Sequence, residues 1–328
     1  RHMQEIACET CHIPQLYAQA LQSVDWSVLQ ADGQPVRQMR GAEIGAGSVN
    51  ELVTGFEPVL LQRQDTDGGI QLAPFNLVVS YYWVYDSPQG VRPVLLQDLN
   101  EVWLGTDGYS PEIISAFDND GDGQLSEGEL SINTAAKQTF IAEKLSALGL
   151  SNPRIQGDVQ PYSINHNVTR GEWATRDCQF CHSDQSRLAS SMVLTASLPV
   201  DAAGNAVLTE FVSDSNTRSA DGFSVESGTL VYTPNPSDHG LYVFGHSRAA
   251  WVDIAGALLF VAVLGAVIVH GGLRYSQALY RRRRTRRQPQ TEKVYMYQVY
   301  ERFWHWLQTF TIVLLLLTGL VIHRPDLF

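Results

Sequence analysis

The 328-residue chain contains four cysteines, and all four belong to two copies of one short motif. The first copy is CETCH at residues 8–12, and the second is CQFCH at residues 178–182. Both copies have the form C-x-x-C-H. Closely spaced cysteines of this kind occur in redox-active disulfide pairs, in zinc sites and in sites of covalent haem attachment.

The histidine after each cysteine pair distinguishes these three chemistries. A thioredoxin-like pair does not need it. A four-cysteine zinc site leaves both histidines without a role, and it requires two segments far apart in the sequence to meet. Haem attachment uses the whole motif, because the two thiols add to the haem vinyl groups and the histidine reaches the iron. The sequence therefore predicts two haems c. The attachment residues are Cys8, Cys11 and His12 for the first haem, and Cys178, Cys181 and His182 for the second.

Low-spin electron-transfer haems usually have a second axial ligand besides the histidine of the motif. Within the first 250 residues, four histidines lie outside the two motifs. Two haems need two such ligands, so about half of these histidines are expected to bind iron. In order of preference, the candidates are His166, His246, His239 and His2.

Charge is distributed unevenly along the chain, whose formal net charge is −11 at pH 7. Acidic residues dominate as far as residue 250, and the basic run RRRRTRR lies at residues 281–287 between two apolar stretches. This placement argues against nucleic-acid binding, which needs basic residues on a folded polar face. Because haem c is attached on the outer side of a bacterial membrane, we expect residues 1–250 to lie in the periplasm.

Two uncharged apolar stretches, at residues 254–273 and 303–323, are each long enough to cross a bilayer core, which takes about 20 residues of helix. We expect transmembrane helices at residues 251–274 and 301–324, with two buried core helices as the alternative. By the positive-inside rule, the basic loop at residues 275–300 is cytoplasmic. The predicted location is the bacterial inner membrane, with a multi-pass topology and a large periplasmic N-terminal region.

Residues 118–129 match the calcium-binding loop of an EF-hand. A helix is predicted just before the loop, because Ser110 and Pro111 form a typical N-cap and first helical position. Gly123 occupies the position where an EF-hand loop turns sharply. A single such loop in a calcium-rich compartment indicates a structural site rather than a sensor. The predicted ligands are Asp118, Asp120, Asp122, Gln124 through its carbonyl, Ser126 through a water molecule, and Glu129.

The predicted fold class is mixed. Residues 57–62 and 76–84 have β-type composition, and the 190–245 stretch alternates apolar and polar residues between turn signals. We expect an irregular, haem-packed α+β region with the EF-hand loop, followed by a strand-rich spacer near the membrane and then two transmembrane α-helices. The expected boundaries are residues 1–190 for the haem region and 191–250 for the spacer.

Two segments resemble the octahaem tetrathionate reductase-like multihaem cytochromes. IACETCHIPQLYAQALQSVDWS, at residues 6–27, resembles their C-x-x-C-H-I-P…D-W-S segment. INHNVTRGEWATRDCQFCHS resembles their H-x-V…A-x-x-C-x-x-C-H-S segment. In that family the upstream histidine ligates a haem other than the one it precedes. The resemblance therefore favours His166 as a ligand and adds weight to His2.

The segment YERFWHWLQTFTIVLLLLTGLVIH, at residues 300–323, resembles the first helix of the b-type cytochrome subunits of respiratory hydrogenases and formate dehydrogenases. That family holds two haems b between four helices and has a quinone site. The resemblance implies that His305 ligates a haem b near the cytoplasmic face, and that His323 is a weaker candidate near the outer face. With one such helix the b-type domain is incomplete, so other membrane subunits are expected. The matching residues are Arg302, His305, Trp306, Thr318 and Gly319.

These features predict a membrane electron-transfer cytochrome. It would link the quinone pool, through haem b, to periplasmic haems c and a periplasmic redox protein or further cytochrome subunits. A terminal reductase of sulfur or nitrogen oxyanions is the alternative, after the multihaem resemblance. No catalytic residue is predicted, so an electron carrier is favoured over a self-contained enzyme. A calcium-responsive receptor is a third possibility that rests on the one EF-hand loop.

Overall fold

The computed structural model describes residues 2–42, 53–64, 67–106, 108–183, 186–213, 217, 220–235, 243, 250–284 and 298–323. The chain divides into two compact units, Arg1–His246 and Ser247–Phe328. Within the first unit the described residues form a mixed α/β structure, which confirms the mixed class predicted from the sequence.

The first unit is built on a sheet of seven strands centred on β4 (Ile70–Ser87). Most residues of β4 are buried, in keeping with its run of β-branched and aromatic side chains between two packed faces. The strand order is β10-β8-β4-β1-β2, with β3 and β5 also paired to β4. The other strands are β1 (Ala20–Leu29), β2 (Pro35–Arg40), β3 (Val59–Gln64), β5 (Gly90–Pro93), β8 (Ser151–Ser163) and β10 (Thr209–Phe211). The strands predicted at residues 57–62 and 76–84 are thus β3 and part of β4.

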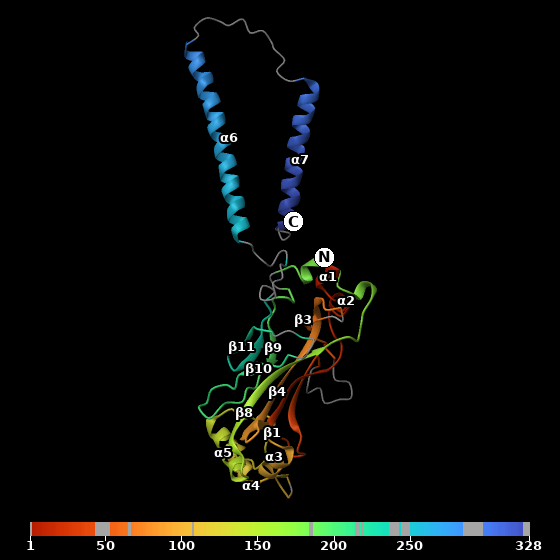
Figure 1. Cartoon of the computed structure of the whole chain (residues 1–328), viewed down its shortest axis with the longest axis vertical. Helices are drawn as coiled ribbons and strands as arrows, with labels where there is room; N and C mark the ends of the chain where they lie inside the picture. Colours follow the sequence, from red (N-terminus) through yellow and green to blue (C-terminus); the bar gives the residue numbers. More distant parts are fainter. Residues whose placement is uncertain are drawn as a thin grey trace. The chain divides into compact units, whose positions relative to one another are not determined.

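Three helices gather at one end of this sheet (Figure 1). They are α3 (Leu96–Trp103), α4 (Pro111–Phe117) and α5 (Ala135–Ala147). Ser110 caps α4 as predicted, because its side chain accepts a hydrogen bond from the Ile113 N–H. Trp103 and Phe117 are fully buried beneath the helices, with ring centroids 4.9 Å apart.

Two very short helices, α1 (His2–Glu5) and α2 (Cys8–His12), lie at the opposite end of the sheet (Figure 1). A second, three-stranded sheet has the order β11-β12-β9, and a two-stranded ribbon joins β6 to β7. Two 3-10 turns precede and overlap the second cysteine motif. These elements are β6 (Leu104–Gly105), β7 (Gly108–Tyr109), β9 (Met192–Thr195), β11 (Phe223–Glu226) and β12 (Thr229–Tyr232), with the turns Gly171–Trp173 and Cys178–Phe180.

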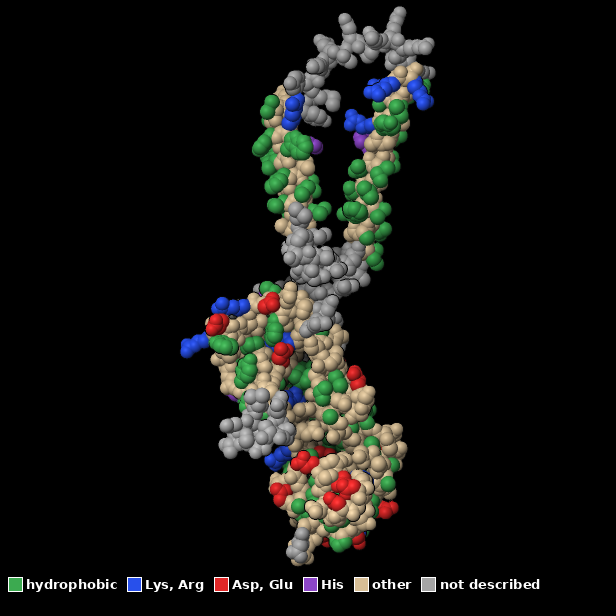
Figure 2. All heavy atoms as spheres, turned by 180° about the vertical axis from the view of Figure 1, so that it is seen from behind, with side chains coloured by type: hydrophobic (Ala, Val, Ile, Leu, Met, Phe, Trp, Pro, Cys, Tyr) green, Lys and Arg blue, Asp and Glu red, His purple; other side chains and the backbone are tan. Residues whose placement is uncertain are grey.

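The second unit contains α6 (Ala250–Arg284) and α7 (Val299–His323). Among the described residues, one helical segment, Ile254–Arg283, is long and apolar enough to cross a membrane. Figure 2 shows hydrophobic side chains along this helix and basic side chains towards one of its ends.

The prediction of two transmembrane helices is therefore wrong. The first half of α7 carries the charged residues Glu301 and Arg302 and the polar residues His305 and Gln308. Over its described residues, α7 does not meet the combination of length and apolar composition that Ile254–Arg283 meets, so the structure supports one membrane-crossing helix.

Candidate functional site

The first cysteine motif forms a single helical turn that is anchored on β4. The Thr10 hydroxyl donates to the Leu72 carbonyl at 2.8 Å, and the Ala7 N–H donates to the same carbonyl at 2.9 Å. Thr10 is buried, whereas Cys8 and Cys11 are exposed thiols. Because residues three apart share a face of a helix, the anchored turn presents both thiols outwards on one side.

The imidazole of His12 is oriented by a backbone hydrogen bond. Its Nδ1 lies 2.8 Å from the Thr169 carbonyl oxygen. A carbonyl only accepts hydrogen bonds, so this contact requires the proton on Nδ1 and leaves the Nε2 lone pair available. Metal-ligating histidines are usually held in this way by an outer hydrogen bond from the other ring nitrogen. The geometry at His12 therefore fits the predicted role as an iron ligand.

The second cysteine motif begins in a 3-10 turn. The Asp177 carboxylate caps this turn by accepting from the Gln179 N–H at 2.9 Å, and the Cys178 carbonyl accepts from the His182 N–H at 2.9 Å. Cys178 is exposed, and Cys181 is partly buried against a cluster that includes Leu188. Burial raises the pKa of the Cys181 thiol, although the nearby Arg187 cation opposes this shift.

The two motifs, far apart in the sequence, are joined by hydrogen bonds. The Thr175 N–H donates to the Cys11 carbonyl at 2.9 Å, and the Thr169 N–H donates to the His12 carbonyl at 2.7 Å. Arg187, which follows the second motif, donates from Nη1 to the carbonyl of Thr10 within the first motif at 3.1 Å. The fold thus brings the two predicted haem attachment points to one end of the sheet.

This proximity removes one objection to a four-cysteine zinc site, since the two segments do meet. Zinc also requires its ligand atoms to converge on one point. Among the described residues, the one group of three or more His, Cys, Asp or Glu ligand atoms that lie within 4.8 Å of one another is Asp118, Asp120 and Glu129. The four cysteine sulfurs do not converge in this way, so the arrangement does not favour zinc.

The rings of His2 and His182 lie close together, in a tilted arrangement. Their centroids are 5.8 Å apart, with an angle of 34° between the ring planes. His2 ranked last among the distal ligand candidates, yet among the described residues it lies beside a motif histidine.

His166 is exposed and lies on the segment that contacts the first motif. Its neighbour Asn165 accepts from Arg63 at 3.0 Å, and Arg63 also forms a 3.2 Å ion pair with Glu9 inside the first motif. His166 is thus held near the first motif, although it precedes the second in the sequence. His239 and His246 lie outside the described residues.

The predicted haem b ligands belong to the second unit. His305 is an exposed residue of α7, and the side chain of His323 lies outside the described residues. Their binding of haem b, and a quinone site beside it, stay predictions from the sequence.

The predicted calcium loop has closely packed acidic side chains. The Glu129 carboxylate accepts from the Asn119 N–H at 2.6 Å, from the Ser126 N–H at 2.9 Å and from the Ser126 hydroxyl at 2.8 Å. These hydrogen bonds lower the pKa of Glu129 to about 2. Asp118 accepts from the Gly121 and Gly123 N–H groups. Carboxylate oxygens of Asp118, Asp120 and Glu129 all lie within 4.8 Å of one another, which is close enough to share a metal ion.

Two of the three glycines of this loop, Gly121 and Gly123, adopt a left-handed backbone conformation. The φ angles are 78° at Gly121 and 77° at Gly123, a region that suits glycine because it lacks a Cβ. The sharp turn predicted at Gly123 is therefore present. Asp122 caps the following turn by accepting from the Gln124 N–H at 2.7 Å.

Comparison with known proteins adds little to this geometry. No known protein family matches the chain, and no curated protein matches it. One solved structure, an octaheme cytochrome c from Shewanella oneidensis, is 15% identical and covers 57% of this chain, with a TM-score of 0.31. The chain spans 45% of the length of that protein. A likeness this weak carries no argument, and the comparisons lend no support to the b-type resemblance of residues 300–323.

Three residues that organise the site were not identified from the sequence. Arg63 and Thr169 join the first motif to the segment that precedes the second, and Arg187 donates to the first motif from just after the second. Thr169 lies within the segment that resembles the multihaem cytochromes, but that resemblance did not mark Thr169 itself.

Proposed function

We propose that the first unit is a two-haem cytochrome c module that carries electrons. The observation that carries this proposal is the meeting of the two C-x-x-C-H motifs, with the Nε2 of His12 available for a metal and His2 beside His182. The residues fit the group, because exposed thiols and oriented imidazoles are the donors that haem c requires. Haem iron would supply reversible one-electron chemistry, and the protein fixes the axial ligands and their surroundings.

We infer that the axial ligands are exchanged between the two motifs. His182 and His2 would serve the second haem, which is supported by the closeness of their rings, whose centroids are 5.8 Å apart. His12 and His166 would serve the first haem, which is supported by the tie from Asn165 through Arg63 to the first motif. Each distal ligand then comes from the sequence that precedes the other motif. Such an exchange would make each haem hold the two segments together.

This arrangement suits electron transfer between the haems and out to a partner. The motifs are linked by short backbone hydrogen bonds, so the haems they hold would lie close together. Three of the four attachment cysteines are exposed, which would leave haem edges accessible to a periplasmic redox protein.

The helix Ile254–Arg283 supports a membrane anchor for this module. The basic run at residues 281–287 would lie on the cytoplasmic side, by the positive-inside rule. The haem module, on the N-terminal side of the anchor, would then face the periplasm. Haem c attachment on the outer side of the membrane demands the same orientation.

We also propose that the Asp118–Glu129 loop binds one calcium ion as a structural site. The support comes from the three ligand carboxylates within 4.8 Å of one another and the EF-hand spacing of the loop. The loop directly follows α4, whose last residue, Phe117, is packed in the core. Calcium would therefore stabilise the end of the sheet opposite to the cysteine motifs.

Mass spectrometry of the intact chain tests the haem proposal. After expression with a haem c maturation system, the wild type should carry two covalent haems. The double variants Cys8→Ser/Cys11→Ser and Cys178→Ser/Cys181→Ser should each carry one. A wild-type chain that leaves maturation with four free thiols would show that the proposal is wrong.

A further inference from the structure

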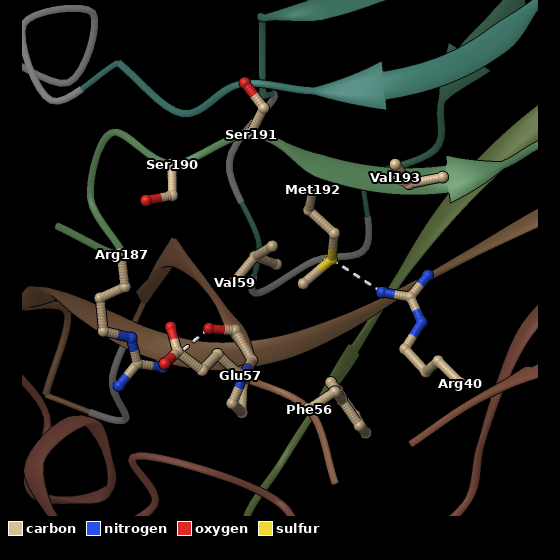
Figure 3. Close-up of a pocket in the computed structure, with 10 residues that line it drawn as sticks. Arg40, Phe56, Glu57, Val59, Arg187, Ser190, Ser191, Met192 and Val193 are labelled. Atoms are coloured by element: carbon tan, nitrogen blue, oxygen red, sulfur yellow. Dashed lines mark hydrogen bonds between the residues drawn. The ribbon is translucent and has the colours of Figure 1, made fainter. Parts of the chain in front are cut away.

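A cavity of about 250 Å³ lies between the strand β9, the chain before β3 and the end of β2. Figure 3 shows Arg40 and Arg187 on opposite sides of it, with Met192 and Phe56 between them. Hydroxyl groups of Ser190 and Ser191 complete the lining.

Arg40 is a buried cation without an anionic partner among the described residues. Its side chain is 8% exposed and stacks over the Phe56 ring at 5.7 Å. Nη2 donates to the Leu77 carbonyl at 3.1 Å, and Nη1 makes only a weak contact with the Met192 sulfur. Nε is buried and has no hydrogen-bond partner. Desolvation lowers the pKa of Arg40 to about 10.

Arg187, on the opposite wall of the cavity, is also a buried cation with an unpaired donor nitrogen. It is 6% exposed, and its two terminal nitrogens donate to the carbonyls of Thr10 and Pro58. Its Nε is also buried without a hydrogen-bond partner. Glu57 acts on it electrostatically but is exposed and makes no ion pair with it in the described structure.

Two buried guanidinium groups line this one cavity, and the nitrogen of Arg40 that faces it meets only the Met192 sulfur (Figure 3), which indicates a missing acceptor. Buried donors are nearly always paired in native proteins, and buried charges are normally compensated. Carboxylates and oxyanions match the planar donors of arginine best. Glu57 is the acidic residue of the lining, so one further negative group would balance the positive charges of the two arginines.

We propose that this cavity binds one oxygen-bearing anionic group, which accepts hydrogen bonds from Arg40 and Arg187. The group has two possible sources with the same chemistry: a small free oxyanion, or a propionate of the haem attached at the second motif, close to Arg187. The propionate case rests on the proposed haem function, whereas the free oxyanion case does not. Either one places an anion beside the two motifs, since Arg187 also contacts Thr10.

The test starts from purified protein whose haem content has been counted by mass, so that failure of the haem proposal is recognised separately. Sulfate is titrated by calorimetry at constant ionic strength into the wild type and into Arg40→Gln and Arg187→Gln. Arg37→Gln is the control, because Arg37 lies on the same strand as Arg40 but is exposed. Saturable binding of one sulfate, weakened at least tenfold in both variants but not in the control, supports a free oxyanion.

If sulfate does not bind, the pH dependence of the haem reduction potentials decides. Loss of either arginine should raise the pH at which a buried propionate ionises. In a plot of reduction potential against pH, the change of slope for one haem should then move to higher pH. Arg37→Gln should leave this change of slope at its wild-type pH. If the glutamine variants fold poorly, Arg40→Lys and Arg187→Lys replace them in the sulfate titration, where loss of the paired guanidinium donors should still weaken binding. Absence of sulfate binding together with unchanged pH profiles in all variants would overturn the proposal.

Discussion

The two ends of the first unit hold candidate sites that are assembled in opposite ways. In the Asp118–Glu129 loop, the acidic side chains accept their hydrogen bonds from N–H and O–H groups of the loop itself. At the cysteine motifs, the connections run between distant segments, such as Thr169 to His12 and Arg187 to Thr10. One site is built by local sequence, the other by the fold.

This difference has consequences for stability. A locally built loop can be altered without disturbing distant segments, because its hydrogen bonds close over a few residues. The motif end depends on three separate stretches of chain, so a change in one stretch should be felt in the others. Changes at the calcium end should therefore leave the haem signals nearly intact.

Phe117→Ala should have the largest effect, because it removes the fully buried ring that stacks on Trp103 at the base of the calcium loop. We expect a loss of about 3–5 kcal/mol in the free energy of unfolding, as for other buried aromatic truncations. Urea denaturation measures it, with the exposed Leu148→Ala as control. If the haem absorbance of Phe117→Ala changed at the same lowered urea concentration as the overall unfolding signal, the two ends would unfold together and not separately.

Glu129→Gln should weaken calcium binding at least about tenfold, because the bidentate ligand of the loop loses its charge. Limited proteolysis should then cut more readily within residues 110–150, while haem potentials stay unchanged. Glu127→Gln is a matched control, since Glu127 is exposed and occupies no ligand position. A large calcium-dependent shift in haem potential would instead indicate a regulatory link between the two ends.

The low pKa of Glu129 predicts an acid-sensitive loop in calcium-free protein. The ordinary pKa of this group is 4.5, and its hydrogen bonds lower it to about 2. A lowered carboxylate pKa stabilises the folded state above the unfolded value, and this stabilisation is lost as the pH falls from about 4.5 to about 2. The stability difference between wild type and Glu129→Gln should therefore be constant above pH 4.5 and shrink below it. Calorimetry across this range measures it, and a difference independent of pH contradicts the expectation.

Thr169→Val should have the smallest effect. It removes the hydroxyl that donates to the His12 carbonyl at 2.9 Å, which is expected to cost about 0.5–1.5 kcal/mol in unfolding free energy. The potential of the first haem should change more than that of the second. Thr175→Val is the control, because its hydroxyl is buried without a partner and its backbone N–H still donates to Cys11. Equal changes at both haems would weaken the assignment of Thr169 to the first motif.

The contrast between a site built from local contacts and one built from distant segments also explains which features could be predicted from the sequence. The EF-hand spacing, the cap at Ser110 and the turn at Gly123 are local patterns, and the structure contains each of them. The closeness of His2 to His182 and the hydrogen bond from Arg187 to Thr10 arise only when distant segments pack together, so they could not be predicted from spacing in the sequence. The second membrane span was predicted from the absence of charge over residues 303–323, whereas among the described residues only Ile254–Arg283 is long and apolar enough to cross a membrane.

Exchange of axial ligands between the motifs is the central claim, and single-haem variants test it most directly. In Cys8→Ser/Cys11→Ser, which keeps only the second haem, adding His2→Ala should convert that haem from low spin to high spin. In Cys178→Ser/Cys181→Ser, which keeps only the first, the same His2→Ala change should leave the low-spin absorbance spectrum as it was. A second haem that stays low spin without His2, or a first haem that becomes high spin, would contradict the account.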